Sequence, residues 1–462
     1  MTTEQAIEKA FISKKEYFDE GNTKSYEFRI EQLKKLKKAI KINETKILEA
    51  LKNDMHKPEM EAYTSEIGVL YEEISYTINH LKSWMKPQKQ RTPLVLHPST
   101  SRIYPEPLGV VLIIGPWNYP FQLLIAPLIG AIAAGNCVVL KPSDNTKNTC
   151  SVIENLVKET FDESYISVVT GPGAMVGPQL IEKYPFNHIF FTGSPSVGKQ
   201  IMTMAAKHLT PVTLELGGKS PAIVDKNVNI DVAARRIVWG KFFNAGQTCV
   251  APGYLLVHQS RKNELIEKLI INIKEFYGLN PEDSEHLTHI VNDKRFQVLE
   301  GYLKDVNIIY GGKTNPSKRI ITPTIVDQVP ENHPLLHDEI FGPILPVLTF
   351  NETKDIIPIV RMNRYPLACY IFTNDKKFEK HIIQNIESGG GCVNNALVHL
   401  VNPRLPFGGV GNSGMGRYHG KYSFEVFSHY KSILKTSTMV DIALRYPPYS
   451  ETKKKWAKRF FE

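Results

Sequence analysis

Between residues 109 and 216 the sequence alternates short, uninterrupted apolar runs with longer segments of helical periodicity. The apolar runs occupy 109–115, 137–140, 166–169, 188–191 and 212–216. The segments between them include predicted helices at 122–134, 148–161 and 194–206. A strand that is apolar on both sides must be buried on both faces, and helices between such strands supply the cover. The alternation therefore predicts an α/β domain built on a parallel sheet.

Four of the predicted strands are followed at once by polar residues or glycine. Asn118, Lys141, Gly193 and Glu215 stand at or just beyond the carboxyl ends of these strands. The carboxyl ends of parallel strands meet at one edge of a sheet, and open α/β sheets bind their ligands there. We therefore expect these four residues to surround one crevice.

A second α/β unit is predicted from Gly217 to about Gly389. It repeats the pattern, with strands at 222–224 and 254–257 and helices at 232–243 and 262–277. Two glycine-rich stretches follow, at 389–391 and 407–416. At the other end of the chain, residues 1–85 show helical periodicity, and the proline-rich stretch 84–104 predicts a linker or an edge hairpin.

Cys249 lies in the second unit, within the stretch FFNAGQTCVAPGY at 242–254. It follows Gly246 and precedes Pro252, so its backbone is predicted to be constrained and non-helical, with the sulfur free to point into a cavity. Most free cysteines, however, are small buried apolar residues. From this stretch alone, a nucleophile and a core thiol are equally good interpretations.

Three features at the predicted strand ends also allow two interpretations each. A buried carboxylate has a raised pKa and can serve as a general base, so Glu215 is a candidate base, or else a partner of Lys219. Lys141 could bind ribose hydroxyls or reach solvent. The stretch FTGSPSVGK at 191–199 joins a strand to a helix, and it could bind a pyrophosphate at the helix N-terminus or be a simple capped turn.

Other patterns exclude several classes of site. No G-x-G-x-x-G follows the first strand, and the similar GPGAMVG at 171–177 has different spacing and is interpreted as a loop. His333 and the stretch HDEIFGP at 337–343 lack metal-ligand spacing, so no metal site is predicted. The net charge of +9 resides largely on a helix face at 34–41 and in a tail at 453–459, without a nucleic-acid motif. Nucleic acid is therefore not an expected partner.

Cysteine usage and hydropathy bear on the compartment. The five cysteines stand at positions 137, 150, 249, 369 and 392, without any C-x-x-C pair. This pattern argues against a disulfide framework and for a reducing compartment, so we expect a cytoplasmic protein. No run of about 18 apolar residues predicts a membrane span. The charged N-terminal stretch also lacks the apolar region of a secretory signal.

Seven motifs together resemble the aldehyde dehydrogenase superfamily in order and spacing. They are PWNYPF, KPSD, FTGSPSVG, LELGGKSP, NAGQTCVAP, EIFGPILP and PFGGVGNSGMGRYHG. The CVAP sequence, YHGKYSFEVFSH at 418–429 and YPPY at 446–449 are similar to the class 3 and fatty aldehyde branch. The resemblance covers nearly the whole chain.

The resemblance implies an aldehyde dehydrogenase-like fold with three parts. A Rossmann-type dinucleotide-binding domain would comprise 1–84 and 105–215, with the N-terminal helices. A catalytic domain at 216–405 would carry Cys249. The segments 85–104 and 425–462 would form a bridging or oligomerisation arm and a C-terminal tail, and the protein would be a homodimer.

The resemblance also implies the reaction, which is NAD(P)-dependent oxidation of aldehydes to carboxylic acids. Cys249 would attack the carbonyl and form a thiohemiacetal and then a thioester, and Glu215 would activate the hydrolytic water. The side-chain amide of Asn118 and the backbone N–H of Cys249 would hold the oxyanion. A free thiol is only about 3% thiolate at pH 7, so a polarising loop and a nearby base would help.

The implied substrate tunnel is lined by Tyr119, Trp239 and His419. These side chains favour aliphatic aldehydes, medium and long chains included, or aromatic ones over anionic semialdehydes. The helical spacing of Trp239 with Val232 and Phe243 equally predicts core packing.

The resemblance assigns nine positions to the cofactor. These are Trp117, Lys141, Asp144, Gly193, Ser194, Gly198, Leu216, Glu339 and Phe341. Lys141 would bind the adenosine ribose, Gly193 and Ser194 the pyrophosphate, and Glu339 the nicotinamide ribose, with Phe341 beside the nicotinamide. Asp144 stands where many relatives carry a glutamate for the adenine ribose. It is one methylene shorter, which leaves both NAD and NADP open, with NAD favoured.

Two other functions are compatible with parts of the sequence. In a coenzyme A-acylating aldehyde dehydrogenase the thiol of coenzyme A takes the acyl group, so a base for water, such as Glu215, is unnecessary. A non-catalytic nucleotide-binding protein would have lost the chemical positions that this chain retains.

The C-terminal tail at 453–461 combines basic and aromatic residues. Each cation near an anionic membrane contributes roughly 1 kcal/mol, so weak peripheral membrane contact is one interpretation. No hydrophobic anchor follows in this sequence, and a frayed or dimer-packing tail is the favoured alternative.

Overall fold

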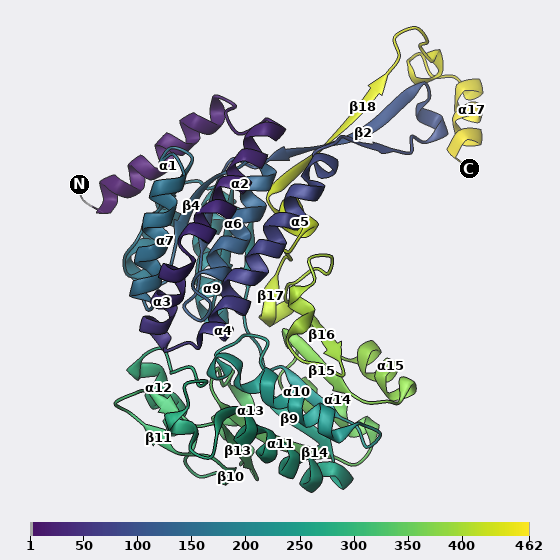
Figure 1. The fold of residues 1–462 in the computed structure, drawn as a ribbon. Coiled ribbons are helices and arrows are strands. Elements are labelled where there is room, and N and C mark those ends of the chain that lie inside the picture. The colour runs from purple at the N-terminus through teal and green to yellow at the C-terminus, as the bar shows by residue number, and fades with distance from the viewer. Residues whose placement is uncertain (1–2, 462) are drawn as a thin grey trace.

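Two mainly parallel sheets form the framework of the protein, which is described over residues 3–461 of a computed structural model (Figure 1). The first sheet has the strand order β17-β7-β6-β3-β4-β5, and all of its strands are parallel except β17. Its strands are β3 (Val110–Ile114), β4 (Cys137–Lys141), β5 (Ile166–Val168), β6 (His188–Thr192), β7 (Val212–Glu215) and β17 (Gly414–Met415). The predicted parallel α/β sheet is confirmed.

Helices cover this first sheet. Helix α6 (Gln122–Ala134) is buried from Leu123 onward because it packs on β3 and β4 and is itself covered by other helices. The covering helices are α2 (Tyr26–Ile42), α5 (Val69–Trp84) and α16 (Lys421–Val426). A helix enclosed in this way is apolar all round, as the sequence of α6 is.

The remaining helices of this body surround the same sheet. They are α1 (Thr3–Asp19), α3 (Glu44–Met55), α4 (Glu59–Ala62), α7 (Lys147–Thr160), α8 (Gly173–Lys183) and α9 (Pro195–Ala205). Helix α8 begins inside the stretch GPGAMVG. The interpretation of 171–177 as a loop is therefore wrong from Gly173 onward.

The second sheet has the order β10-β13-β14-β9-β8-β15-β16, with β10 alone antiparallel to its neighbour. Its strands are β8 (Pro221–Val224), β9 (Tyr254–His258), β10 (Asn307–Tyr310), β13 (Thr324–Asp327), β14 (Ile344–Phe350), β15 (Ala368–Phe372) and β16 (Gly390–Val393). Its helices are α10 (Ile230–Phe242), α11 (Lys262–Tyr277), α12 (Asp293–Gly301), α13 (Pro334–His337), α14 (Thr353–Arg361) and α15 (Lys376–Asn385). Strands β11 (Thr314–Asn315) and β12 (Ile320–Ile321) form a small separate hairpin.

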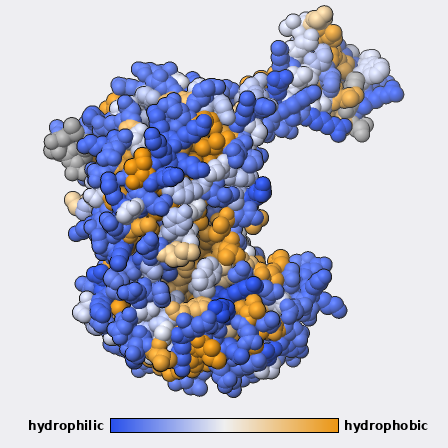
Figure 2. Space-filling model, in the orientation of Figure 1, coloured by the Kyte–Doolittle hydropathy of each residue, from blue (hydrophilic) through white to orange (hydrophobic). Residues whose placement is uncertain are grey.

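A three-stranded antiparallel arm projects from the first body (Figure 1). Strand β1 (Gln88–Gln90) pairs with β2 (Ser99–Pro107), so the stretch that predicted a linker or an edge hairpin forms a hairpin. Strand β18 (Ser428–Thr436) pairs with β2 along its whole length. Helix α17 (Glu451–Phe461) lies at the far end of the arm, where Figure 2 shows hydrophobic residues on the surface.

The order of the first sheet determines where a ligand can bind. From β3 the chain moves outward through β4 and β5, and then returns to place β6 on the other side of β3. This change of direction opens a crevice at the carboxyl ends of β3 and β6. Within residues 3–461, no helix is long and apolar enough to cross a membrane.

Candidate active site

Cys249 lies where two hollows of the protein meet. The first, which we name the apolar cavity, is lined mostly by hydrophobic side chains of both α/β bodies. The second, the strand-end cleft, runs along the carboxyl ends of β3, β4 and β6 and onto the second body. Thr192, Glu215, Leu216 and Cys249 border both of them. A group in the cleft and a group in the cavity can therefore meet at the sulfur.

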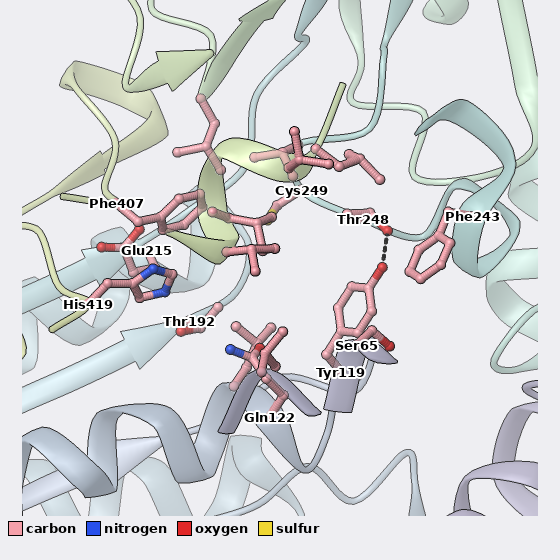
Figure 3. A pocket seen from close by; sticks show the side chains of 18 of the residues that line it. Ser65, Tyr119, Gln122, Thr192, Glu215, Phe243, Thr248, Cys249, Phe407 and His419 are labelled. Carbon is pink, nitrogen blue, oxygen red and sulfur yellow. Dashed lines mark hydrogen bonds between the residues drawn. The ribbon is translucent and has the colours of Figure 1, made fainter. Parts of the chain in front are cut away.

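The loop that carries Cys249 has an unusual backbone. After α10, Asn244, Ala245 and Gly246 all adopt positive φ angles of 54°, 51° and 70°. At Gly246 a Cβ atom would clash with the carbonyl oxygen of Gly342, so this turn requires glycine. The conformation ends the helical path and directs the Cys249 side chain toward the apolar cavity (Figure 3).

The surroundings of Cys249 oppose ionisation of its thiol. Burial raises its pKa to about 12, and the nearby carboxylates of Glu339 and Glu215 act in the same direction. The backbone N–H groups of Cys249 and Val250 favour the thiolate and work against this shift. In this state of the protein the thiol is therefore neutral at pH 7.

Glu215 ends β7, in register with Thr192 on β6. Both of its carboxyl oxygens are buried without a hydrogen-bond partner, and burial raises its pKa well above the usual value. The alternative pairing with Lys219 is wrong, because Lys219 Nζ donates instead to the carbonyl oxygen of Asp338 at 2.8 Å. A carboxylate in this position can take up a proton from a water molecule beside Cys249.

Asn118 and Tyr119 connect the two bodies next to Cys249. Asn118 Nδ2 donates to the carbonyl oxygen of Gln247 at 3.0 Å. The Tyr119 hydroxyl and Thr248 Oγ1 form a 2.6 Å hydrogen bond (Figure 3). The amide of Asn118 carries a second hydrogen, which can be donated to a ligand oxygen.

The three predicted tunnel residues all line the apolar cavity. Tyr119 and His419 are buried, and burial lowers the pKa of His419 to about 4, so its ring is neutral and stacks on Phe407 at 5.4 Å. Trp239 is 37% exposed at the rim of the cavity. The alternative that Trp239 packs in the core is therefore wrong.

Several cavity residues were not predicted from the sequence. They include Thr64, Ser65, Val69, Thr192, Phe243, Thr248, Leu397, Val398, Leu400, Val401, Phe407 and Tyr418. Five of them had a local signal, because they lie inside motifs that the sequence analysis singled out: Thr192, Phe243, Thr248, Phe407 and Tyr418. Thr64 and Ser65 belong to a π-helix, Tyr63–Gly68, and Val398–Val401 to a 3₁₀ turn. Nothing in these two short segments distinguishes them before the chain is folded.

Eight of the nine predicted cofactor positions line the strand-end cleft. They are Trp117, Lys141, Asp144, Gly193, Ser194, Leu216, Glu339 and Phe341. The ninth, Gly198, is buried on α9, where an added Cβ would lie 2.7 Å from Leu216 Cδ2. Ser194 caps α9 by accepting from the N–H of Val197 at 3.4 Å, and the N-terminus of this helix borders the cleft.

Charged groups at both ends of the cleft are buried. The Lys141 side chain is 3% exposed, so the alternative that it reaches solvent is wrong. Its Nζ donates to the carbonyl oxygen of Pro142 at 2.9 Å and lies 3.9 Å from Asp144 Oδ1. At the other end, burial raises the pKa of Glu339 to about 7, and its Oε1 has no hydrogen-bond partner. An unpartnered buried carboxylate oxygen and a buried ammonium fit a ligand with hydroxyl groups.

Over residues 3–461, no group of three or more His, Cys, Asp or Glu side chains is placed to hold a metal ion.

The geometry agrees with known proteins. A sequence model described as "Aldehyde dehydrogenase family" matches residues 1–433. The chain belongs to the aldehyde dehydrogenase family. It is an NAD(P)-dependent oxidoreductase that acts on aldehydes.

Relatives of this aldehyde dehydrogenase match it over nearly its full length. It is 48% identical to the 4,4'-diaponeurosporen-aldehyde dehydrogenase of Staphylococcus aureus, covering 99% of each chain. It is 44% identical to the dimeric, NADP-preferring aldehyde dehydrogenase of Rattus norvegicus, covering 94% of this chain and 96% of the relative. A solved structure of a Staphylococcus aureus AldH in a substrate-bound state superposes with a TM-score of 0.96 at 48% identity, covering 99% of each chain.

Proposed function

We propose that Cys249, Glu215 and Asn118 carry the aldehyde oxidation in this enzyme. Cys249 attacks the aldehyde carbon and forms a thiohemiacetal, with the oxyanion held by the Asn118 amide and the Cys249 backbone N–H. Loss of a hydride from the thiohemiacetal carbon to the dinucleotide would leave a thioester on Cys249, and Glu215 would then take a proton from the water that hydrolyses it. The observation that carries this proposal is that Cys249 and Glu215 border both the apolar cavity and the strand-end cleft.

We further propose that the strand-end cleft holds the dinucleotide, within a domain formed by 1–84 and 105–215. Lys141 and Asp144 would bind the adenosine ribose, the N-terminus of α9 with Gly193 and Ser194 the pyrophosphate, and Glu339 the nicotinamide ribose. The unpartnered Oε1 of Glu339 supports this fit. When bound, the dinucleotide supplies the hydride acceptor of the reaction.

The site proposal is tested by replacing the nucleophile. Cys249→Ser should lower aldehyde oxidation below detection, because a serine hydroxyl is a far weaker nucleophile at neutral pH. Binding of the reduced dinucleotide, followed by its fluorescence, should stay within about threefold of wild type, because every other residue of the cleft is unchanged. Cys369→Ser is a matched control, since Cys369 is also buried but lies on β15, outside both hollows. Turnover retained in Cys249→Ser would remove Cys249 from this role.

We propose that the substrates are long apolar aldehydes. The lining of the apolar cavity continues from the buried Cys249 to exposed hydrophobic side chains at Trp239, Val398 and Val401. Each buried CH₂ of a substrate contributes about 0.8 kcal/mol, so kcat/KM should rise by about tenfold or more for each added pair of buried carbons. A related Staphylococcus aureus enzyme is named for 4,4'-diaponeurosporen-aldehyde, which adds support.

A panel of straight-chain, polyene and aromatic aldehydes, run with NAD and with NADP, tests this substrate class. Rates that do not depend on chain length would contradict it. With coenzyme A present, the main product should still be the free acid. If acyl-coenzyme A is the main product instead, the acyl group is transferred to coenzyme A rather than to water, and the hydrolysis step is contradicted.

We propose that the enzyme works as a homodimer in the cytoplasm. The arm, with its exposed apolar side chains, supports a dimer, as does the relative of Rattus norvegicus that is described as dimeric. All five cysteines are free thiols, which suits a reducing compartment. Trp456 and Phe461 are exposed on α17, and we assign them to contacts between copies of this chain rather than to a membrane surface.

A further inference from the structure

A buried ion pair from the N-terminal helices lies beneath the loop that carries Asn118. Lys57 Nζ and Glu66 Oε1 are 2.6 Å apart, and both side chains are completely buried. Lys57 stands just after α3, and Glu66 lies in the π-helix Tyr63–Gly68, which replaces regular helix between α4 and α5. Single turns of π-helix occur frequently at functional sites. This feature belongs to a part of the chain for which the sequence predicted only covering helices.

The ion pair binds the Asn118 loop at two points. Lys57 Nζ donates to the carbonyl oxygen of Asn118 at 3.2 Å. Glu66 Oε2 accepts from the backbone N–H groups of Phe121 and Gln122 at 3.1 and 3.0 Å. Helix α6, which begins at Gln122, has no side-chain cap of its own, so the carboxylate of Glu66 takes that place at the positive end of the helix.

The same loop is bound to the Cys249 loop on its other side. Asn244 Nδ2 donates to the carbonyl oxygen of Asn118 at 3.0 Å, and Asn118 Nδ2 donates to Gln247. The peptide carbonyl of Asn118 therefore receives hydrogen bonds from both the ion pair and the Cys249 loop. The amide of Asn118 cannot shift without breaking this set.

We propose that Lys57 and Glu66 are positioning residues that hold Asn118 where its amide meets the oxyanion, an inference that rests on the proposed role of Asn118. Oxyanion donors must lie about 2.7–3.1 Å from the oxygen that develops the charge, and they must be held within about 0.5 Å of that geometry to be effective. The ion pair performs this placement from below the loop, without touching substrate. The π-helix also presents Thr64 and Ser65 to the apolar cavity, so one segment sets both the donor and part of the cavity wall.

The test is a double-mutant cycle between Lys57→Met and Asn118→Ala in the full-length enzyme. Lys57→Met should lower kcat by about tenfold or more, with dinucleotide affinity within about twofold of wild type. In the Asn118→Ala background the same change should cost less than about threefold, because the donor it positions is gone. Equal losses in both backgrounds would overturn the inference and leave a purely structural ion pair.

Two controls separate the possible outcomes. Lys262→Met breaks another largely buried ion pair, with Asp327 at 2.8 Å, away from both hollows, and should lower the unfolding midpoint without lowering kcat. If Lys57→Met does not fold, the double variant Lys57→Met with Glu66→Gln removes both charges of the ion pair and enters the same cycle. If Asn118→Ala alone leaves kcat unchanged, the oxyanion role of Asn118 fails, and the positioning role fails with it.

Discussion

At Cys249 the protein holds its proposed nucleophile in the protonated form. Burial contributes most to the raised thiol pKa, and Glu339 is the largest charged contributor. Glu339 itself has a pKa raised to about 7, so its charge near the thiol changes within the physiological range. Reactivity of the sulfur is thus coupled to a carboxylate in the strand-end cleft.

This coupling predicts the pH dependence of Cys249 alkylation. Glu339→Gln removes a negative charge that raises the thiol pKa, so the pH profile of alkylation should move to lower pH. Above pH 7 the variant should react faster than wild type. Below pH 7 the two rates should converge, because Glu339 in the wild type is then protonated. Alkylation is measured with iodoacetamide in the absence of dinucleotide, by mass spectrometry of the Cys249 peptide. Superimposable profiles would exclude an effect of Glu339 on the thiol.

Some site residues could be predicted from the sequence and others could not, depending on whether local sequence or a distant contact determines their position. Asn118, Lys141, Gly193 and Glu215 could be predicted because strand ends converge at one edge of a parallel sheet, whatever the details of packing. The positioning role of Lys57 and Glu66 could not be predicted, because the Asn118 loop that they bind lies more than 50 positions away along the chain and only the tertiary fold brings it to them.

At the scale of elements, the contact between α9 and β7 sets the shape of the cleft. Gly198 lets the helix approach Leu216, a residue that borders both hollows. Glycine in a helix interior is otherwise unfavourable, so its presence here indicates a packing requirement rather than a direct contact with the dinucleotide.

We therefore predict that Gly198→Ala weakens dinucleotide binding through Leu216. The added methyl group would lie 2.7 Å from one Leu216 methyl and 3.3 Å from the other, which is close enough to displace the side chain. Overpacking of this kind costs about 1–3 kcal/mol of unfolding free energy. Gly301→Ala at the end of α12 is the control, since its added methyl would meet no atom within 4 Å. The two variants are compared by urea unfolding and by dinucleotide Kd, and equal values would contradict the packing role of Gly198.

Helices and strands could be predicted where a short stretch of sequence shows which of their faces are buried. They could not be predicted where they depend on pairing with a segment far away in the sequence. The strands β3 to β7 are apolar on both faces, and their positions follow from short stretches of sequence. The pairing of β2 with β18 joins residues more than 300 positions apart, and neither strand has a distinctive hydrophobic pattern. In the π-helix at 63–68, Glu66 is completely buried and is bonded to the backbone N–H groups of Phe121 and Gln122, which are likewise distant in the sequence.

At the scale of the whole molecule, the arm is a sheet that lies largely uncovered by the other residues of 3–461. Most residues of β18 are exposed, including the hydrophobic side chains of Ile433 and Leu434. A few strands without a covering layer are marginally stable in water, so such an arm requires a surface to pack on. A second copy of the chain offers that surface, and two-fold symmetry would bury both arms at once.

The dimer proposal predicts that charges on the arm separate the protomers. Ile433→Glu together with Leu434→Glu should convert a dimer of about 105 kDa, twice the 52.3 kDa of one chain, into a monomer by light scattering. Ile42→Glu, at an isoleucine on the body that is more exposed than either arm residue, should leave the mass unchanged. A dimer that survives both arm substitutions would place the interface elsewhere.

Truncation before Lys453 tests the tail separately. If Trp456 and Phe461 serve contacts between protomers, the full-length and the truncated protein should sediment with liposomes to the same extent. Pelleting that is lost on truncation would instead assign this end of the arm to a lipid surface, where the basic residues of α17 would meet anionic headgroups.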